Sequence, residues 1–382
     1  MSDARFLAGI CCVLGTRQLA LLVALPFIAI HGQDLAHSTP ALIGLALGIY
    51  GLLQGLLQIP FGRWSDAVGR KRVVLLGTAA LIVGLVVSAV ATDIVWFVIG
   101  RALQGAGAIT GVAYAWIADH TADDRRSRAM GVAGLAVAGA ALVSFVVGPL
   151  LYRVLSVPQI FLVCAALVTL VWIFVLLGMR DAAAAPPDVA ARRPLGAILR
   201  MTELRRLVVV GFLVNYLFTA VCFVVPLVLA ESLGARELWK ALIPAALVGI
   251  VAMRVATRRA DAGRFASTAA ACCAAVLPIV PGLWIGHPLA VTIGTASFMA
   301  GYLGLTALVP AAVTSLAGER ARGTASGVYN SALFFGSFAG GTLTGILWGV
   351  RPSLATYAML AAWAAAQLAM LRVPDPARAA AQ

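Results

Sequence analysis

The segment 61–73 gathers charge in a chain that is 62% apolar and only 11% charged. Its sequence, FGRWSDAVGRKRV, contains one carboxylate, Asp66, and four cations that include Arg70 and Lys71. An arginine guanidinium is a forked donor that can pair with two carboxylates at once, so we expect Arg70 to bridge Asp66 and the later Asp119. These residue types predict an ion-pair network.

Two glycines frame this cluster. We expect Gly62 to remove a side chain where two helices approach each other, and Gly69 to allow a tight reversal of the chain. The alternative is that the cations of this segment only fix the topology of the chain, which is our interpretation for Arg63 and Arg72. Lys71 stays open between a topological role and a place in the network.

Polar side chains also occur inside long apolar stretches, where an ionisable group is costly and normally faces a cavity or a partner. Arg17 and Arg101 are the two arginines of this kind, and Arg17 either lines a cavity or organises contacts between spans. Tyr50, Gln54 and Gln58 recur every fourth residue, so on a helix they form one stripe, which we expect to face a central cavity or the eleventh span. The other cavity candidates are Gln18, Asn215, Tyr216 and Asn330.

The composition is that of an integral membrane protein with an all-α fold. The mean hydropathy is +0.98, and stretches long enough to cross the hydrocarbon of a bilayer recur from end to end. The sequence predicts twelve spanning helices, at about 6–30, 41–61, 73–91, 94–118, 129–151, 160–179, 207–230, 238–256, 266–284, 289–316, 325–349 and 354–371. The eighth is the least regular, because Arg254 interrupts its end.

The basic residues predict the orientation of the chain. Of the 28 Lys and Arg residues, 22 fall on the side that holds both termini and four on the opposite side. Because cytoplasmic loops retain cations, we expect both termini to be cytoplasmic. The net charge of +13 is spread over separate loops, where topology and anionic lipid account for it. We therefore expect membrane lipid as a partner and no nucleic acid.

A polar interval at 180–206 reads as a cytoplasmic linker between two six-span halves, 1–179 and 207–382, the second with a short cytoplasmic tail. A repeat supports this division. The segment 126–132, RSRAMGV, leads into the fifth span, and the segment 322–328, RGTASGV, leads into the eleventh. Both segments start on the same side of the membrane, which predicts a parallel repeat of the two halves.

Two segments resemble signatures of the major facilitator superfamily. The segment 62–71, GRWSDAVGRK, is similar to the loop motif G-x-x-x-D-x-x-G-R-[KR], and 101–107, RALQGAG, is similar to the signature R-x-x-Q-G-x-G. Within the superfamily the chain most resembles the bacterial YajR-type, drug:proton antiporter-like exporters, through LIGLALGIYG at 42–51 and GTASGVYN at 323–330. The resemblance implies twelve transmembrane helices in two pseudo-symmetric six-helix halves.

The resemblance also implies roles for single residues. Asp66 would face the start of the eleventh span near Gly323, where unpaired N–H groups and the helix dipole favour a carboxylate. The network of Asp66 would then latch the two halves together on the cytoplasmic side. Arg101 alone would serve structural support and proton-linked switching. Gln104 and Gly105 match the same signature, and plain helix packing is the alternative for both.

Two other segments depart from the pattern of the superfamily. The fifth span keeps only Gly148-Pro149 of the antiporter motif G-x-x-x-G-P-x-x-G-G, which leaves antiport less secure than membership of the superfamily. The second-half loop 258–264, RRADAGR, is one residue short of D-x-x-G-R. We therefore expect the second-half latch to be degraded or absent.

The fifteen Asp and Glu residues lie between the apolar stretches or near their ends. This distribution is awkward for proton coupling, which normally needs a carboxylate or histidine that titrates with alternating access. The proton-carrier candidates are Asp34, with His31 and His37 nearby, and Glu231, both near the outer end, and Asp119 at the inner end. The alternative for each is a solvated loop residue. The sequence has no phosphate-binding loop and no H-E-x-x-H or zinc-ligand spacing, so we expect no ATP, no metal and no enzymatic activity.

We therefore expect a secondary active transporter in the bacterial inner membrane that moves small amphipathic or hydrophobic compounds by alternating access, as a proton-coupled exporter. The proton gradient would supply the energy, and we expect no cofactor. The expected soluble partner is a small-molecule substrate. We expect the protein to be a monomer. Two alternatives stay open. One is a lipid or lysolipid flippase, and the other is a transporter-like sensor or scaffold without turnover.

Overall fold

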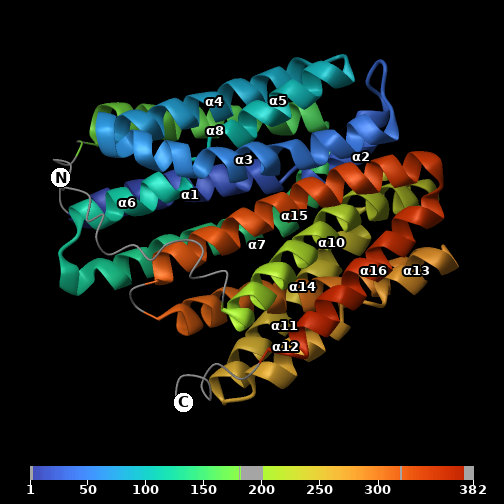
Figure 1. The fold of residues 1–382 in the computed structure, drawn as a ribbon. Coiled ribbons are helices and arrows are strands. Elements are labelled where there is room, and N and C mark those ends of the chain that lie inside the picture. Colours follow the sequence, from blue (N-terminus) through green and yellow to red (C-terminus); the bar gives the residue numbers. More distant parts are fainter. Residues whose placement is uncertain (1–2, 180, 182–200, 319–320, 374–382) are drawn as a thin grey trace. The chain divides into compact units, whose positions relative to one another are not determined.

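The computed structural model describes residues 3–179, 181, 201–318 and 321–373 (Figure 1). These residues form helices and turns, with no strand among them and one isolated bridge between Ala36 and Asp93. Twelve of the helical segments are long and apolar enough to cross a membrane. The predicted all-α membrane fold with twelve spans is therefore confirmed.

The chain divides into two compact units, Met1–Pro187 and Asp188–Gln382, each with six of the twelve spans. Of the linker predicted at 180–206, residues 180 and 182–200 lie outside the described residues. The helix of the seventh span begins at Thr202, so the last residues of the predicted linker are helical. Glu203 explains this earlier start, because an acid in the first turn favours a helix N-terminus.

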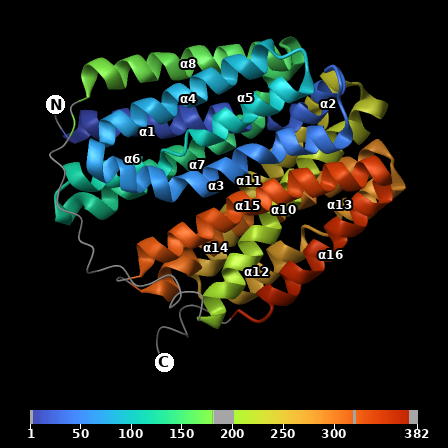
Figure 2. The same ribbon diagram turned by 45° about the horizontal axis from the view of Figure 1, so that its top comes forward.

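The first unit consists of helices joined by short turns (Figure 2). In chain order these are α1 (Asp3–Leu22), η1 (Leu25–Phe27), α2 (Ile28–Gln33), α3 (Pro40–Val68), α4 (Arg70–Val90), α5 (Ile94–Ala106), α6 (Thr110–His120), α7 (Asp123–Val154) and α8 (Val157–Gly178). The first span comprises α1, η1 and α2, and the fourth comprises α5 and α6.

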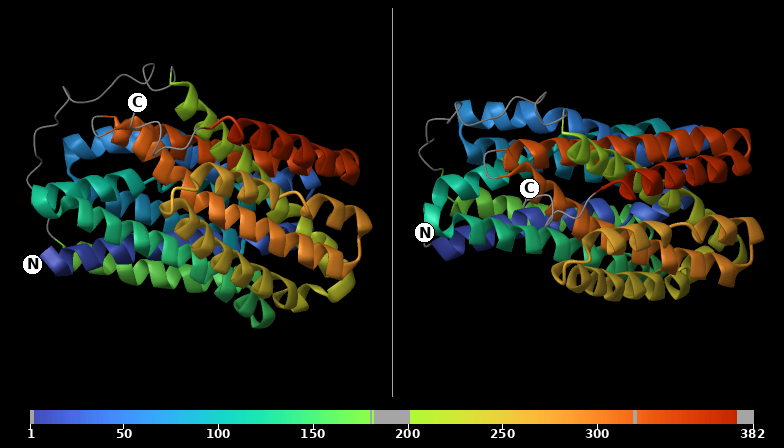
Figure 3. Two further views of the ribbon diagram at one scale, coloured as in Figure 1. Left: turned by 90° about the horizontal axis from the view of Figure 1, so that it is seen from below. Right: turned by 60° about the horizontal axis from the view of Figure 1, so that its bottom comes forward.

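The second unit is drawn in yellow-green to red in Figure 3. It has the same number of spans as the first unit. Its elements are α10 (Thr202–Leu233), η3 (Ala235–Glu237), α11 (Trp239–Asp261), α12 (Phe265–Ala274), α13 (Ile279–Ile285), α14 (Pro288–Ala317), α15 (Arg322–Val350) and α16 (Pro352–Met370). Arg254, expected to interrupt the eighth span, lies within α11 with its side chain exposed. A long arginine side chain can reach the polar boundary without ending its helix.

The fourth span is interrupted where the sequence predicted a continuous helix. Helix α5 ends at Ala106, and α6 begins at Thr110. The break leaves backbone groups around Gly107 without helical partners, and within a membrane such groups are tolerated only where the protein or water bonds to them. The structure supplies that partner, as described below.

Helix α5 packs closely against α3 and α4. A Cβ atom on Gly105 would lie 2.6 Å from the Cα atom of Tyr50, and one on Gly84 would lie 2.6 Å from the backbone nitrogen of Gln104. Small residues at such crossings let helix backbones approach each other. This packing brings Arg101 of α5 within reach of the backbone of α3.

Candidate functional site

The first candidate site lies where α3 ends and α4 begins. Gly69 separates the two helices with a φ of +100°, a conformation that favours glycine. This reversal, which the sequence predicted, places Arg70 of α4 beside the last turn of α3. A Cβ atom on Gly62, by contrast, would meet no described atom of its own unit within 4 Å, so the close helix approach expected there is not found within the unit.

Arg70 is the centre of an ion-pair network. Its Nη1 pairs with Oδ1 of Asp66 and donates to the Ser65 hydroxyl oxygen at 2.5 Å, while its Nε donates to Oδ2 of Asp119 at 2.9 Å. The side chains of Arg70 and Asp119 are each 13% exposed, and that of Asp66 is 26% exposed. The bridge predicted between the two carboxylates is present, and it is partly shielded from water.

Each of the three charges is unfavourably placed with respect to its own helix. Asp66 and Asp119 lie in the last turns of α3 and α6, where a helix dipole disfavours an anion. Arg70 lies in the first turn of α4, where the dipole disfavours a cation. Since each member offsets the unfavourable position of the others, the network should form and break as one unit, which is what a switch requires.

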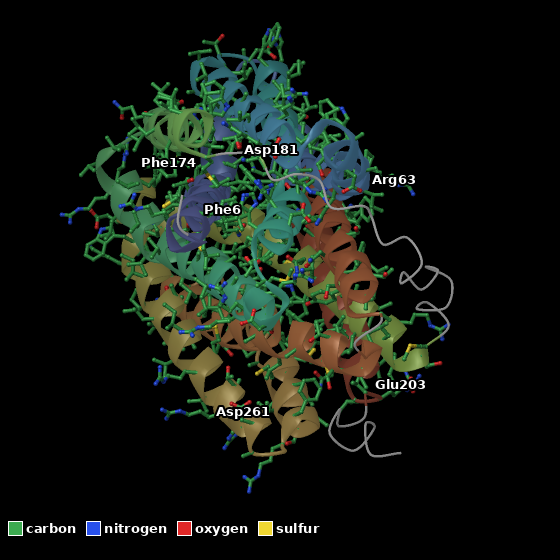
Figure 4. The ribbon with its side chains drawn as sticks, turned by 90° about the vertical axis from the view of Figure 1, so that its left-hand side faces the viewer. Phe6, Arg63, Phe174, Asp181, Glu203 and Asp261 are labelled. Atoms are coloured by element: carbon green, nitrogen blue, oxygen red, sulfur yellow. The ribbon has the colours of Figure 1, made fainter. Side chains whose placement is uncertain are left out.

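Lys71 fastens the neighbouring helix α8 to this loop. Its Nζ donates to the carbonyl oxygens of Leu176 at 2.8 Å and Met179 at 2.6 Å, which lie at the C-terminal end of α8. Asp181, just beyond α8, accepts a hydrogen bond from the Lys71 backbone N–H at 3.1 Å, beside Gly69 (Figure 4). The loop therefore holds the point where the chain leaves the sixth span.

These partners of Lys71 were not predicted from the sequence. Carbonyl groups at a helix end exist in every helix, so no residue type marks the ones that Lys71 binds. Asp181 lies 110 residues from Lys71, and it was grouped with the other acids between spans. Ser65 could have been found, because its hydroxyl directly precedes Asp66 in the loop motif.

A second candidate site is the buried network of Arg101. The arginine donates from Nε to the Ala46 carbonyl oxygen at 3.2 Å and from Nη1 to Oε1 of Gln104 at 2.5 Å. Its guanidinium carbon lies 4.9 Å from the centre of the Tyr50 ring, and Gln104 donates to the Ser88 hydroxyl oxygen at 2.9 Å. Arg101 and Gln104 are fully buried, so the network ties α5 to α3 and α4.

Arg17 forms a similar network at the break in the fourth span. Its Nε donates to the Gly107 carbonyl oxygen at 3.1 Å, and its Nη2 donates to Oε1 of Gln54. Arg17 is 4% exposed and Gln54 is fully buried. The Gly107 carbonyl oxygen also accepts from the Ile109 backbone N–H at 2.8 Å, and the arginine connects this interruption between α5 and α6 to α1 and α3.

These networks change the interpretation of the polar stripe on α3. Tyr50 and Gln54 contact Arg101 and Arg17 inside the first unit, and a place beside a central cavity or the eleventh span stays a prediction. The physical reason is that a buried guanidinium needs polar partners close by. Gln58, the third member of the stripe, is half-buried. Neither arginine pairs with a carboxylate of any described residue.

The cavity candidates outside these networks are half-buried or buried. Gln18 on α1 and Asn330 on α15 are half-buried. Asn215 donates to the carbonyl oxygen of Gly211 on its own helix at 3.3 Å, and Tyr216 is 5% exposed. Their role in a cavity stays a prediction.

The proton-carrier candidates Asp34 and Glu231 are exposed. Asp34 follows the end of α2, and Glu231 lies in the last turn of α10. His37, expected near Asp34, instead places its Nδ1 2.6 Å from Oδ2 of Asp93. That hydrogen bond, followed by one from the Val95 backbone N–H, lowers the pKa of Asp93, which caps the start of α5.

Residues 6–341 match the family model described as Major Facilitator Superfamily. The chain belongs to this superfamily. Over 364 residues it is 28% identical to "Inner membrane transport protein YajR" of Escherichia coli (strain K12), across 93% of this chain and 80% of that protein. Over 126 residues it is 32% identical to "Tetracycline resistance protein, class E" of Escherichia coli, across 32% of this chain and 31% of that protein.

A solved structure agrees with this assignment at the level of the fold. The crystal structure of a bacterial homolog to the human lysosomal transporter Spinster, in an inward-facing and occupied conformation, matches with a TM-score of 0.73 at 16% sequence identity. The match covers 99% of this chain and 95% of that chain. The predicted superfamily is thus confirmed, and the chain is a multi-pass membrane protein related to secondary transporters.

Proposed function

We propose that this protein is a proton-coupled exporter of small amphipathic or hydrophobic compounds in a bacterial inner membrane, with the Arg70 network as its conformational latch. The observation that carries the proposal is the guanidinium of Arg70 held between Asp66 and Asp119 in the signature loop. Membership of the superfamily and the likeness to YajR and to a tetracycline resistance protein support the transport and efflux parts of the proposal.

The latch needs a partner that changes with the transport cycle. Arg70 pairs with Oδ1 of Asp66, which leaves Oδ2 available to another donor. We propose that this donor is the first turn of α15 near Gly323, on the cytoplasmic side of the membrane, where the N–H groups are unpaired. A carboxylate at a helix N-terminus contributes about 0.3–1 kcal/mol when exposed and up to about 2 kcal/mol when partly buried. A difference of about 2 kcal/mol changes the ratio of latched to open molecules about 30-fold.

The distribution of charge favours a neutral or lipophilic cargo. No acid lies in the middle of a span, so the membrane interior offers no carboxylate to a cationic compound. The two buried arginines already bond to amide and carbonyl oxygens of their own unit. Apolar contacts with a few hydrogen bonds would then hold the cargo, as in most small-molecule sites.

The proposal is tested with purified protein in liposomes that enclose a pH-sensitive dye, screened against lipophilic dyes and drugs. We expect each transported compound to move protons, and we expect Asp66→Asn to abolish most of this movement because it removes the latch carboxylate. Asp261→Asn is the matched control, because Asp261 occupies the corresponding loop of the second unit, is exposed and has no described ion-pair partner. Asp34→Asn and Glu231→Gln test the two proposed proton carriers.

The same assay separates the alternatives. Proton movement that is equal in wild type and Asp66→Asn would overturn the latch. Binding of a compound without flux under any gradient would favour the sensor or scaffold. Movement of labelled phospholipid between leaflets, with no drug-driven proton movement, would favour a lipid or lysolipid flippase.

A further inference from the structure

The α11–α12 turn corresponds to the latch loop of the first unit, but its charges are not paired with each other. The segment 253–265 contains one acid and a cluster of four cations, Arg254, Arg258, Arg259 and Arg264. All four arginine side chains and Asp261 are exposed, and none of them makes an ion pair with a described residue. In the first unit, by contrast, Arg70 is held by two carboxylates. The second-unit cations are therefore available to an external anion.

An apolar groove of about 570 Å³ leads away from this cluster along α11, with α12 and α14 as its other walls. Leu247, Val251 and Val255 line it at four-residue intervals, and Arg259 continues the same stripe at the charged end. At the rise of an α-helix, the stripe from Leu247 to Arg259 is about 18 Å long. On α12 the lining includes the small residue Ala271, which keeps the groove open.

The exposure of this stripe defines the chemistry of its occupant. The side chains of Leu247, Val251 and Val255 are 51%, 64% and 49% exposed, on a helix of membrane-spanning length and composition. The occupant must be apolar over most of the groove and anionic beside Arg259. A polypeptide segment there would bring backbone groups that hydrocarbon cannot satisfy, and a free phosphate would not use the apolar length. An anionic phospholipid meets both requirements.

We propose that this groove binds one anionic phospholipid, with an acyl chain along the α11 stripe and the phosphate on Arg259. The neighbouring arginines add positive charge at the headgroup. Basic pockets between helices on the cytoplasmic side of membrane proteins hold anionic headgroups in the same way, and each nearby cation strengthens binding about fivefold. The site does not depend on which compound the protein transports, because it lies within the second unit and uses none of the latch residues.

Figure 4 shows the end of the second unit that carries Asp261, where side chains tipped with nitrogen project around α11 and α12. The first unit has a comparable groove of about 630 Å³ between α1 and α8. Each groove has one cationic lining residue, Arg5 here and Arg259 in the second unit, but only Arg259 lies in a segment with three further exposed arginines. We therefore expect weaker discrimination between anionic and zwitterionic lipid in that groove, and any lipid retained there is independent of Arg259.

The test counts phospholipids retained on the detergent-solubilised protein by native mass spectrometry, after mixing with equal amounts of phosphatidylglycerol and phosphatidylcholine. We expect wild type to retain phosphatidylglycerol preferentially. Arg259→Gln should weaken that retention about fivefold, and Ala271→Phe should reduce it by filling the groove. The matched controls are Arg351→Gln, an exposed arginine at the other end of the unit, and Ala274→Phe, an exposed alanine of α12 outside the groove. Both controls should behave as wild type.

Three results would overturn the proposal. The first is equal retention of the two lipids by wild type. The second is wild-type retention of phosphatidylglycerol by both Arg259→Gln and Ala271→Phe. The third is a combination of two findings: inorganic phosphate alone displaces phosphatidylglycerol, and Ala271→Phe does not change its retention. This combination would show a simple anion site. If Arg259→Gln does not fold, Ala271→Phe and its control carry the test. Lipid retention requires no transport, so its failure is distinguishable from failure of the proposed export.

Discussion

At the scale of single residues, Arg70 is hard to replace because its contacts use different edges of one guanidinium. Nη1 serves Asp66 and Ser65, while Nε serves Asp119 on another helix. A lysine ammonium is a compact point charge on a flexible stem and cannot reproduce this fork. The two carboxylates also lie at C-terminal helix ends, so losing one of the contacts exposes an anion to an unfavourable dipole.

We therefore expect Arg70→Lys to impair transport although it keeps the charge. Loss of one hydrogen bond between charged groups costs about 1.5–3 kcal/mol, which shifts the latch toward its open form about 10- to 150-fold. The measurement is compound-driven proton movement in liposomes. Arg72→Lys is the matched control, because Arg72 is an exposed neighbour in the same loop without a described side-chain partner. Equal activity of the two variants would contradict a forked bridge.

Asp93 allows a prediction about pH. Hydrogen bonds from His37 and then from the Val95 backbone lower the pKa of Asp93 below its ordinary value. A lowered carboxylate pKa stabilises the folded state above the unfolded-state pKa, and this contribution is lost as the pH falls through the folded-state value. His37→Gln should therefore lower the Tm near neutral pH, and its difference from wild type should disappear once the pH is below the lowered pKa of Asp93. A difference that grows on acidification would contradict this assignment.

At the scale of elements, the interruption between α5 and α6 is coupled to the placement of Arg17. The break takes the Gly107 carbonyl oxygen out of the helical hydrogen-bond pattern, and this oxygen accepts from the Ile109 backbone N–H at 2.8 Å and from Arg17 on α1 at 3.1 Å. An unpartnered guanidinium is costly within a membrane, and the break offers Arg17 an acceptor. Together they join three helical segments of the first unit at one point.

The close packing of α5 gives a second prediction at this scale. Gly105→Ala would place a methyl group 2.6 Å from the Tyr50 Cα atom, so a backbone must shift, and we expect a loss of about 1–3 kcal/mol. The shift would also move Arg101 away from the Ala46 carbonyl. Gly131→Ala on α7 is the control, because its methyl group would meet no described atom within 4 Å. Thermal unfolding in detergent should separate the two variants, and equal Tm values would refute the close approach.

The sequence predicted the elements better than their interruptions. The spans followed from apolar length, and the Arg70 bridge followed from the spacing of Asp66 and the glycines in the loop motif. The break at Gly107 was missed, because its energetic compensation comes from Arg17, 90 residues away. The contacts of Tyr50 with Arg101 and of Gln54 with Arg17 were missed for a related reason. A helical stripe shows that residues share a face, but it does not identify the helix that this face contacts.

At the scale of the whole molecule, the two units repeat a pattern of six spans but differ in their charges. The first unit contains Arg17 and Arg101, which are the charged residues buried among those described. The buried polar residues of the second unit are serines and threonines, which can bond to their own helix backbones. The loop cations of the two units also differ. Arg70 is paired with carboxylates, whereas the arginines around Arg259 make no ion pair with a described residue. We infer that switching chemistry concentrates in the first unit, while the second offers a charged surface to lipid.

Both the latch and the lipid site require that the loops with most arginines face the cytoplasm. The 22 to 4 distribution of cations predicts this orientation, because the insertion machinery retains basic loops. A fluorescent protein fused after Gln382 should therefore fluoresce in intact cells, and alkaline phosphatase fused within η3, after Glu237, should be active. The reciprocal fusions are the controls and should be silent. Active phosphatase at the C-terminus would reverse the orientation, placing Arg70 and Arg259 on the outer face and removing the basis for a cytoplasmic latch.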